Sequence, residues 1–328
     1  RAWWSVCLVS SFTSSVEYSV LTSWGVRVCW ARSPSLQRSI AAYLGLAVGD
    51  ALGATVEFMN PAEIRHEYGV HKNMIGGGWL KLKAGDITDD TEMSLALGNA
   101  ILAAGKVDPT SVAEAFSEWM RSKPKDIGNT VRRGIVQYRR TGQTTMPESE
   151  HDAGNGACMR CLPVALFTLN QPWKTVQTTA RLQAHVTHHN PVSDAGTECI
   201  IHMVQTAILG EPLAELELLA RELVMRYPVF EYRQRRRDNP SGYIVDTLQA
   251  VFQALFSTDN FEAALVDVVN RGGDADTTGA ILGMVAGALY GLDNIPTRWL
   301  ERLNPTIRAQ CTQQARALYQ LAQQGHNP

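Results

Sequence analysis

Beyond about residue 36, apolar residues recur with the spacing of amphipathic helices, and the two-residue alternation typical of strands is almost absent. One predicted helical face is built from Met93, Leu97, Ala100, Ile101 and Ala104. Similar patterns predict helices over residues 110–121, 192–208, 212–226, 243–256, 261–269 and 306–323. The pattern therefore predicts an all-α protein, and 328 residues are enough to bury a substantial core.

Glycines recur at every fourth position near the end of the chain, at Gly279, Gly283, Gly287 and Gly291. Each glycine should cost a solvated helix about 1 kcal/mol relative to alanine. Apolar residues stand between the glycines, and the segment is too short to span a membrane as a helix. We therefore predict a core helix that packs closely against another backbone.

The overall composition limits the partners that the chain can use. Its 45% hydrophobic and 19% charged residues are typical of a globular protein, and a net charge of −2 gives no general attraction to nucleic acid or lipid. No transmembrane segment is expected. Six widely spaced cysteines indicate reduced thiols in a cytoplasmic protein. Cys158 and Cys161 have the spacing of half a zinc site or a redox pair, but two small buried residues are the favoured interpretation.

Residues 1–38 differ from the rest of the chain. They are rich in tryptophan, serine and threonine, they show no clear period, and no methionine precedes Met59. We expect this stretch to be an atypical N-terminal extension, either disordered or non-native. Residues 39–328 are expected to form one domain.

Two short segments place acidic and hydroxyl side chains directly before helix-like runs. They are "GDITDDT" at 85–91 and "GGDADTT" at 272–278. Carboxylate and hydroxyl oxygens without cysteine or histidine are the ligands that Mg²⁺ and Mn²⁺ prefer. If the two segments meet, a pair of bridged divalent cations would relieve the repulsion between the carboxylates. The candidate ligands are Thr88, Asp89, Asp90, Asp274, Asp276 and Thr277.

Helix capping is the alternative explanation for these acids. Aspartate and threonine are favoured at helix N-termini, so Asp90 and Asp276 could stabilise two helix starts and nothing more. Two segments that each carry two aspartates and a threonine favour a metal site over capping.

"GNGACMR", residues 154–160, is a second candidate site. Gly154 and Gly156 allow backbone amides to approach a ligand closely, and Asn155 offers both a donor and an acceptor. A phosphate or ribose cradle and an ordinary turn explain this short motif equally well.

Two further clusters carry chemistry that the sequence leaves open. The histidines before Asn190 could bind Mn or Zn, or could bond the backbone at a helix entry, which is the commoner case. They are His185, His188 and His189. An arginine run at 233–237 is either a solvated loop or a docking point for an acidic partner or a pyrophosphate.

Taken together, several motifs resemble those of the ADP-ribosylglycohydrolases, over residues 39 to 304. The matching stretches are "GLAVGDALGATVEF", "GDITDDTEMS", "KPKDIGNTVRRGI", "GNGACMR", "THHNPVSDA" and "GGDADTTGAILGM". The resemblance implies a single compact orthogonal helical bundle with a cleft that holds two divalent cations, Mn²⁺ or Mg²⁺. It assigns the six candidate ligands above to these cations.

The same resemblance implies roles for other residues. Asp126 matches an acid near the glycosidic bond and is the expected general acid. Glu57 matches an acid close to the metals and is the alternative. The residues implied to bind ADP-ribose are Gly154, Asn155, Gly156, Met159, His188 and Tyr243, of which Tyr243 would stack on the adenine. Cys158 and Cys161 depart from the family pattern, because small or polar residues are expected there.

Within the family, motif order and spacing are most similar in members that free an arginine of dinitrogenase reductase, the nitrogenase iron protein, from ADP-ribose. The resemblance therefore implies a hydrolase that cleaves the N-glycosidic bond between ADP-ribose and an arginine of that protein. It also implies regulation by a PII-type signal protein. A monomer is expected. Alternatives are release of ADP-ribose from serine, nucleic acid or a small metabolite, and a non-catalytic ADP-ribose-binding regulator.

Overall fold

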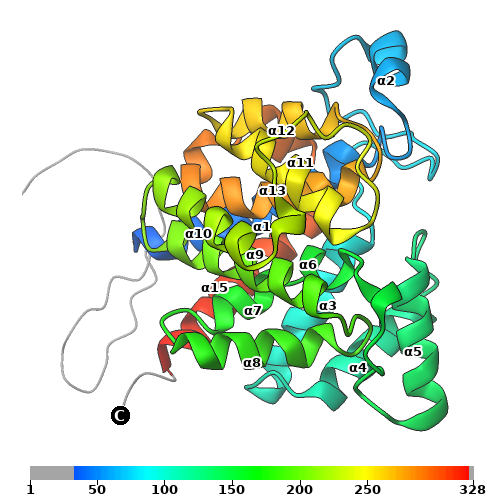
Figure 1. Ribbon diagram of the computed structural model, residues 1–328, viewed down its shortest axis with the longest axis vertical. Coiled ribbons are helices and arrows are strands. Elements are labelled where there is room, and N and C mark those ends of the chain that lie inside the picture. The colour runs from blue at the N-terminus through cyan, green and yellow to red at the C-terminus, as the bar shows by residue number, and fades with distance from the viewer. Residues whose placement is uncertain (1–32, 325–328) are drawn as a thin grey trace, which may run out of the picture. The chain divides into compact units, whose positions relative to one another are not determined.

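The computed structural model describes residues 33–324, and these residues form a bundle of α-helices (Figure 1). The chain divides into two units, and the second, Pro34–Pro328, contains every helix of the described range. The helices are α1 (Pro34–Gly53), α2 (Pro61–Tyr68), α3 (Asp89–Ala104), α4 (Pro109–Arg121), α5 (Asn129–Thr141), α6 (Gly156–Met159), α7 (Leu162–Phe167), α8 (Trp173–Ala184), α9 (Pro191–Ile208), α10 (Leu213–Arg226), α11 (Ile244–Phe256), α12 (Phe261–Val269), α13 (Ala275–Tyr290), α14 (Thr297–Arg302) and α15 (Pro305–Gln324).

The all-α prediction is confirmed for residues 33–324. Pairing between extended segments is limited there to two isolated bridges, Gly77 with Leu82 and Gly154 with Tyr243. Short 3-10 turns complete the structure at η2 (Glu150–Asp152), η3 (Pro228–Phe230) and η4 (Leu292–Asn294). In the same range, no helix combines the length and hydrophobicity that a membrane span requires.

Helices α1 and α13 pack against each other at the centre of the bundle (Figure 1). A Cβ atom built on Gly283 would lie 2.0 Å from the carbonyl oxygen of Gly45, and one on Gly49 would lie 1.9 Å from that of Gly279. At the end of the contact, a Cβ on Gly53 would lie 2.1 Å from the carbonyl oxygen of Ala275. The prediction of a glycine helix packed against another backbone is confirmed, and α1 is its partner.

Amphipathic spacing predicted helices α3, α4, α9, α10, α11, α12 and α15. It did not predict α1, because residues 39–53 are buried on every side and show no polar face. It also missed α5, whose buried residues are only Val131, Gly134 and Ile135. The other helices without a predicted counterpart are α2, α6, α7, α8 and α14. In α3 one placement was wrong: Ala104 is exposed at the last turn, because the helix ends at Gly105 beyond the packed region.

Cys158 and Cys161 are both buried and free. Burial raises the pKa of the Cys158 thiol well above its usual value, so this sulfur stays protonated and unreactive. The two cysteines therefore behave as small core residues. Of the predicted domain division, residues 1–32 lie outside the described range, and α1 begins at Pro34.

Candidate active site

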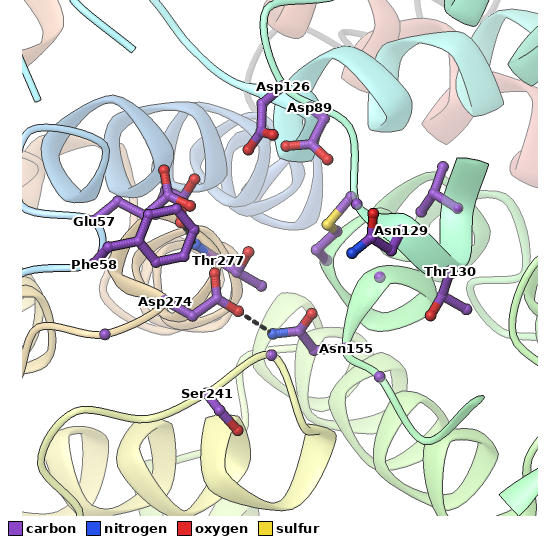
Figure 2. A pocket seen from close by; sticks show the side chains of 18 of the residues that line it. Glu57, Phe58, Asp89, Asp126, Asn129, Thr130, Asn155, Ser241, Asp274 and Thr277 are labelled. Carbon is purple, nitrogen blue, oxygen red and sulfur yellow. Dashed lines mark hydrogen bonds between the residues drawn. The ribbon is translucent and has the colours of Figure 1, made fainter. Parts of the chain in front are cut away.

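A cavity of about 640 Å³ opens where the loops before α3, α5, α6 and α13 converge (Figure 2). Segments from very different parts of the chain form its wall. They are residues 57–58, Trp79, Asp89, 126–131, 154–156, Met159, His188, 239–242, 273–274 and 276–277. Carboxylates gather on one part of this wall, and backbone and amide groups gather on another.

The two acidic segments meet at the floor of this cavity. Carboxylate oxygens of Glu57, Asp274 and Asp276 lie within 4.8 Å of one another, and so do those of Asp89, Asp90 and Asp276. Asp276 belongs to both groups and therefore connects the two segments. The hydroxyl of Thr277 donates to Asp90 across 187 residues of sequence, at 3.3 Å.

The capping explanation for the acids is not supported by the hydrogen bonds. Thr88 and Asp274 occupy the N-cap positions of α3 and α13, and neither side chain makes a capping bond. Asp50 of α1 takes over this function for α3. Its carboxylate accepts the backbone N–H groups of Thr88 at 3.0 Å and of Thr91 at 3.1 Å, and it also accepts both hydroxyls. The aspartates of α3 thus remain available for other ligands.

Asp50 is a residue that the sequence analysis missed as part of the site. It is fully buried, and burial raises its pKa to about 6, although the hydrogen bonds from Thr91 and Thr88 oppose the increase. A signal was present, because Asp50 is the only charged residue between Arg38 and Glu57 in an otherwise apolar and small-residue stretch. An isolated carboxylate in such a stretch requires a buried partner.

One atom of the cluster lacks a partner. Asp90 is fully buried, and its Oδ1 has no hydrogen-bond partner in the structure. Burial and the neighbouring carboxylates raise the pKa of Asp89, Asp90 and Asp276 well above the usual range. A buried set of oxygen donors that repel one another fits hard divalent cations, and these residues could hold them.

Glu57 and Asp126 also face the cavity, from two different loops (Figure 2). Burial raises the pKa of Glu57 to about 8, and the charges of Asp274 and Asp126 raise it further. The indole Nε1–H of Trp79 donates to the carboxylate at 2.6 Å and lowers the pKa. The pKa of Asp126 is raised by burial as well, while its carboxylate accepts the N–H of Ile127 at 2.7 Å. Glu57 therefore carries a proton at neutral pH in the absence of cations.

The "GNG" motif lies beside the acidic cluster and contacts it directly. Asn155 Nδ2 donates to Asp274 Oδ2 at 2.6 Å, the bond drawn in Figure 2, and to the hydroxyl of Thr247 at 2.9 Å. A Cβ on Gly156 would lie 2.7 Å from the ring of His188, and one on Gly154 would lie 3.0 Å from it. Both glycines therefore allow the imidazole to reach the cavity wall.

A buried hydrogen-bond chain orients His188. Arg160 donates to the hydroxyl of Thr187 at 2.7 Å, and that hydroxyl lies 2.8 Å from His188 Nδ1. Burial, together with the charges of Arg160 and Arg133, lowers the pKa of His188 well below its usual value. The hydroxyl satisfies both neighbours if it donates its proton to Nδ1, which leaves Nε2–H as a donor on the cavity side.

Not every candidate residue reaches the cavity wall. Thr88 and Asp90 lie behind it, and Tyr243 lies beside it, next to Gly242, with 39% of its surface exposed.

The other two histidines and the arginine run lie outside the cavity wall. His185 bonds Asp194, and His189 bonds the backbone oxygen of Met146, the role expected at a helix entry. None of the arginines at 233–237 lines the cavity. Several of them instead pair with nearby acids.

Comparisons with known proteins agree with this arrangement. The sequence profile of the ADP-ribosylglycohydrolases matches residues 32–328. The chain is 50% identical over 285 residues to the ADP-ribosyl-[dinitrogen reductase] glycohydrolase of Rhodospirillum rubrum, covering 87% of this chain and 96% of that protein. It is 36% identical over 288 residues to the ADP-ribosylarginine hydrolase Tri1 of Serratia proteamaculans (strain 568), covering 83% of this chain and 76% of that protein.

A solved structure described as an ADP-ribosylglycohydrolase-related protein complex superimposes with a TM-score of 0.77 at 34% identity. The match covers 88% of this chain and 99% of that one. The profile, the relatives and the shared fold agree with the convergence of two acidic segments on one cavity, and the chain belongs to the ADP-ribosylglycohydrolase family.

Proposed function

We propose that this protein hydrolyses the N-glycosidic bond between ADP-ribose and an arginine of a modified protein. The observation that carries the proposal is the buried carboxylate cluster on the cavity floor, where Asp90 Oδ1 has no partner. Two relatives, 50% and 36% identical to this chain, are named ADP-ribosyl-[dinitrogen reductase] glycohydrolase and ADP-ribosylarginine hydrolase. These names support the arginine linkage.

The acidic cluster would hold two divalent cations, Mn²⁺ or Mg²⁺. We assign their ligands to Thr88, Asp89, Asp90, Asp274, Asp276 and Thr277. When bound, the cations would supply Lewis-acid stabilisation to the ribose hydroxyls and to a water molecule. Asp50 would keep the start of α3 in place, because it bonds Thr88 and Thr91.

The remaining carboxyl groups would move protons. In the proposed step, a water oxygen bonds to ribose C1″ and the bond from C1″ to the guanidino nitrogen breaks. The departing nitrogen takes the proton of Glu57, and Asp126 takes the proton that the water loses. Both groups then exchange protons with solvent. Glu57 faces the cavity beside Asp274, a position that supports its role as the acid, and Asp126 is the alternative acid.

The other side of the cavity would bind ADP-ribose. Asn155 Nδ2 is held by Asp274 and Thr247, which would leave the side-chain Oδ1 to accept a hydrogen bond from a sugar hydroxyl. The backbone N–H of Asn155 already donates to the carbonyl oxygen of Gly242 at 2.9 Å. Gly154, Gly156 and Met159 shape this wall, and His188 offers its Nε2–H. Tyr243, exposed beside the cavity, would stack on the adenine.

The decisive experiment compares two substrates under two conditions. One peptide carries ADP-ribose on arginine and the other carries it on serine, and each is incubated with and without Mn²⁺. We expect cation-dependent release from the arginine peptide, lost in Asp90→Asn and retained in the exposed control Asp238→Asn. Release from serine alone would support the alternative substrate, and ADP-ribose binding without any release would indicate a regulatory module.

Asp126→Asn tests the proton-transfer assignment. We expect kcat to fall by about 10²-fold or more while Mn²⁺ affinity is nearly unchanged, because Asp126 lies outside both cation-binding groups. Steady-state turnover and calorimetric Mn²⁺ titration measure the two quantities. Wild-type turnover in this variant would refute a role for Asp126.

Dinitrogenase reductase is the protein substrate that we propose to test first, since the 50% identical relative is named for it. Reactivation of the ADP-ribosylated reductase by the purified chain is the direct assay. Regulation by a PII-type protein, the monomeric state and a cytoplasmic location stay predictions from the sequence.

A further inference from the structure

Large aromatic side chains are exposed at only a few places in residues 33–324, and all of these adjoin the cavity. Phe58 is 66% exposed, Trp79 is 50% exposed, and Tyr243 is 39% exposed. Phe58 and Trp79 both line the cavity, and their ring centroids are 5.4 Å apart at an angle of 46°. We call these two residues the aromatic rim. Adjoining exposed apolar side chains at the edge of a cavity are typical of a surface that binds a ligand or a partner.

The backbone of Phe58 is held in an unfavourable conformation. Its φ of 64° lies in the left-handed region, which costs a residue other than glycine about 1 kcal/mol or more. Its N–H donates to the carbonyl oxygen of Gly273 at 2.7 Å, directly before Asp274. The acidic loop thus holds the backbone of Phe58 in a conformation that presents the phenyl ring at the cavity, although the φ angle itself is unfavourable.

The aromatic rim adjoins the proposed proton donor. Phe58 follows Glu57 in the chain, and Trp79 Nε1 donates to the Glu57 carboxylate at 2.6 Å. Figure 2 shows Glu57 and Phe58 on one side of Asp274 and Asn155 on the other. If Glu57 protonates the departing nitrogen, that nitrogen lies within hydrogen-bonding distance of Glu57. The arginine must then extend past the rim to reach solvent.

We propose that Phe58 and Trp79 bind the arginine side chain and the adjoining backbone of the protein substrate. This inference rests on the proposed arginine hydrolysis. A planar guanidinium group stacks on aromatic faces and is attracted by their π electrons. In this arrangement ADP-ribose occupies the side of the cavity opposite the aromatic rim. The rim recognises the arginine of the linkage, and Tyr243 recognises the adenine.

The test compares substrate hydrolysis with nucleotide binding in the full-length enzyme. For Phe58→Ala we expect KM for an ADP-ribosyl-arginine peptide to rise about 10-fold, the effect of losing a desolvated cation–π contact. The Kd for free ADP-ribose, measured by calorimetry with Mn²⁺ present, should change by less than about 2-fold. Tyr243→Ala should instead weaken ADP-ribose binding. Met225→Ala, at an exposed apolar residue outside the cavity wall, should change neither quantity.

Trp79→Phe separates stacking from the hydrogen bond to Glu57. We expect it to retain the KM of the wild type for the arginine peptide, because a ring remains at the rim. The kcat should fall while KM stays unchanged, because Glu57 loses the indole N–H that orients its carboxylate. Trp79→Ala, which removes the ring as well, should also raise KM. An equal change of KM and kcat in both variants would indicate a purely structural role of Trp79.

Two outcomes would overturn the aromatic-rim proposal. One is an equal loss of ADP-ribose affinity and peptide KM in Phe58→Ala, which would place the nucleotide on the rim. The other is an unchanged KM in both Phe58→Ala and Trp79→Ala. Failure of the proposed function is a different result, namely no release of ADP-ribose from the arginine peptide by the wild-type protein.

Discussion

Helices α1 and α13 contain two regions of opposite character. Along the middle of the pair, glycines bring the two backbones so close that a Cβ on Gly283 would lie 2.0 Å from the oxygen of Gly45. At the end of the pair, where α1 ends and α13 begins, Asp50 and Asp276 are buried and Asp274 is half-buried among other acids. The first region is tightly packed and apolar, whereas the second is electrostatically strained.

The difference shows how the fold tolerates its own active site. A cluster of buried carboxylates favours separation, because each raises the pKa of its neighbours. The glycine contact opposes separation, because close backbone packing leaves the helices no room to slide. The close packing of α1 against α13 therefore offsets the repulsion between the carboxylates at the end of the helix pair.

Breaking the glycine contact should have the largest effect. In Gly283→Val, the new side chain must displace the α1 backbone, and we expect the free energy of unfolding to fall by more than about 3 kcal/mol. Urea denaturation followed by circular dichroism measures the loss. The control Ala103→Gly, on an exposed turn of α3, should cost about 1 kcal/mol. If both variants lose the same amount, the helix contact is not tight.

Removing a charge from the acidic end should have opposite effects on activity and stability. For Asp276→Asn we expect kcat to fall by about 10²-fold or more, with weaker Mn²⁺ binding, because Asp276 belongs to both carboxylate groups. The metal-free variant should be more stable than the wild type by roughly 1 kcal/mol, because repulsion is relieved. Calorimetry and urea denaturation in EDTA test both claims. A less stable metal-free variant would contradict them.

The acidic end should also make the metal-free protein sensitive to pH. The folded-state pKa of Asp50 is raised to about 6 and that of Glu57 to about 8, so protonated forms favour the fold. The stability they provide is complete below their unfolded pKa values near 4 and is lost as pH rises through about 6 and then about 8. Denaturation in EDTA between pH 4 and 9 should show a loss of about 2 kcal/mol or more.

Divalent cations should reduce that loss, since they neutralise the carboxylates whose repulsion causes it. The same pH series with Mn²⁺ provides the comparison. His188, whose pKa is lowered by burial, stabilises the fold as pH rises through about 6.5, so the window that reports on Glu57 lies above pH 7. A metal-free protein whose stability does not fall between pH 7 and 9 would contradict the raised pKa of Glu57.

The smallest effect is expected outside the helix pair, at Thr187. In Thr187→Val, His188 loses the hydroxyl beside Nδ1, and we expect ADP-ribose affinity to fall by about 5-fold, the effect of about one hydrogen bond. Thr187→Ser keeps the hydroxyl and should resemble the wild type. Equal affinities in the valine and serine variants would show that the tautomer of His188 does not affect binding.

The site was only partly predictable from the sequence. Thr88 and Asp274 each precede a helix, and Asp89, Asp90, Asp276 and Thr277 lie in the first turns of the same two helices. Their oxygen chemistry indicated a shared site before any contact was known. Asp50 was missed because its partners lie 38 and 41 residues away. Trp79 was missed for the same reason, since only folding brings its indole to Glu57.

The sequence by itself determined most of the long helices, the two oxygen-rich helix starts and the glycine repeat, because spacing along the chain controls each of them. The tertiary structure alone decided that α1 is the partner of the glycine repeat, and that Asp50 caps α3 so that Asp90 is left without a partner for one oxygen. These contacts join segments far apart in the chain, and packing of the whole core, rather than local propensity, sets which segments meet.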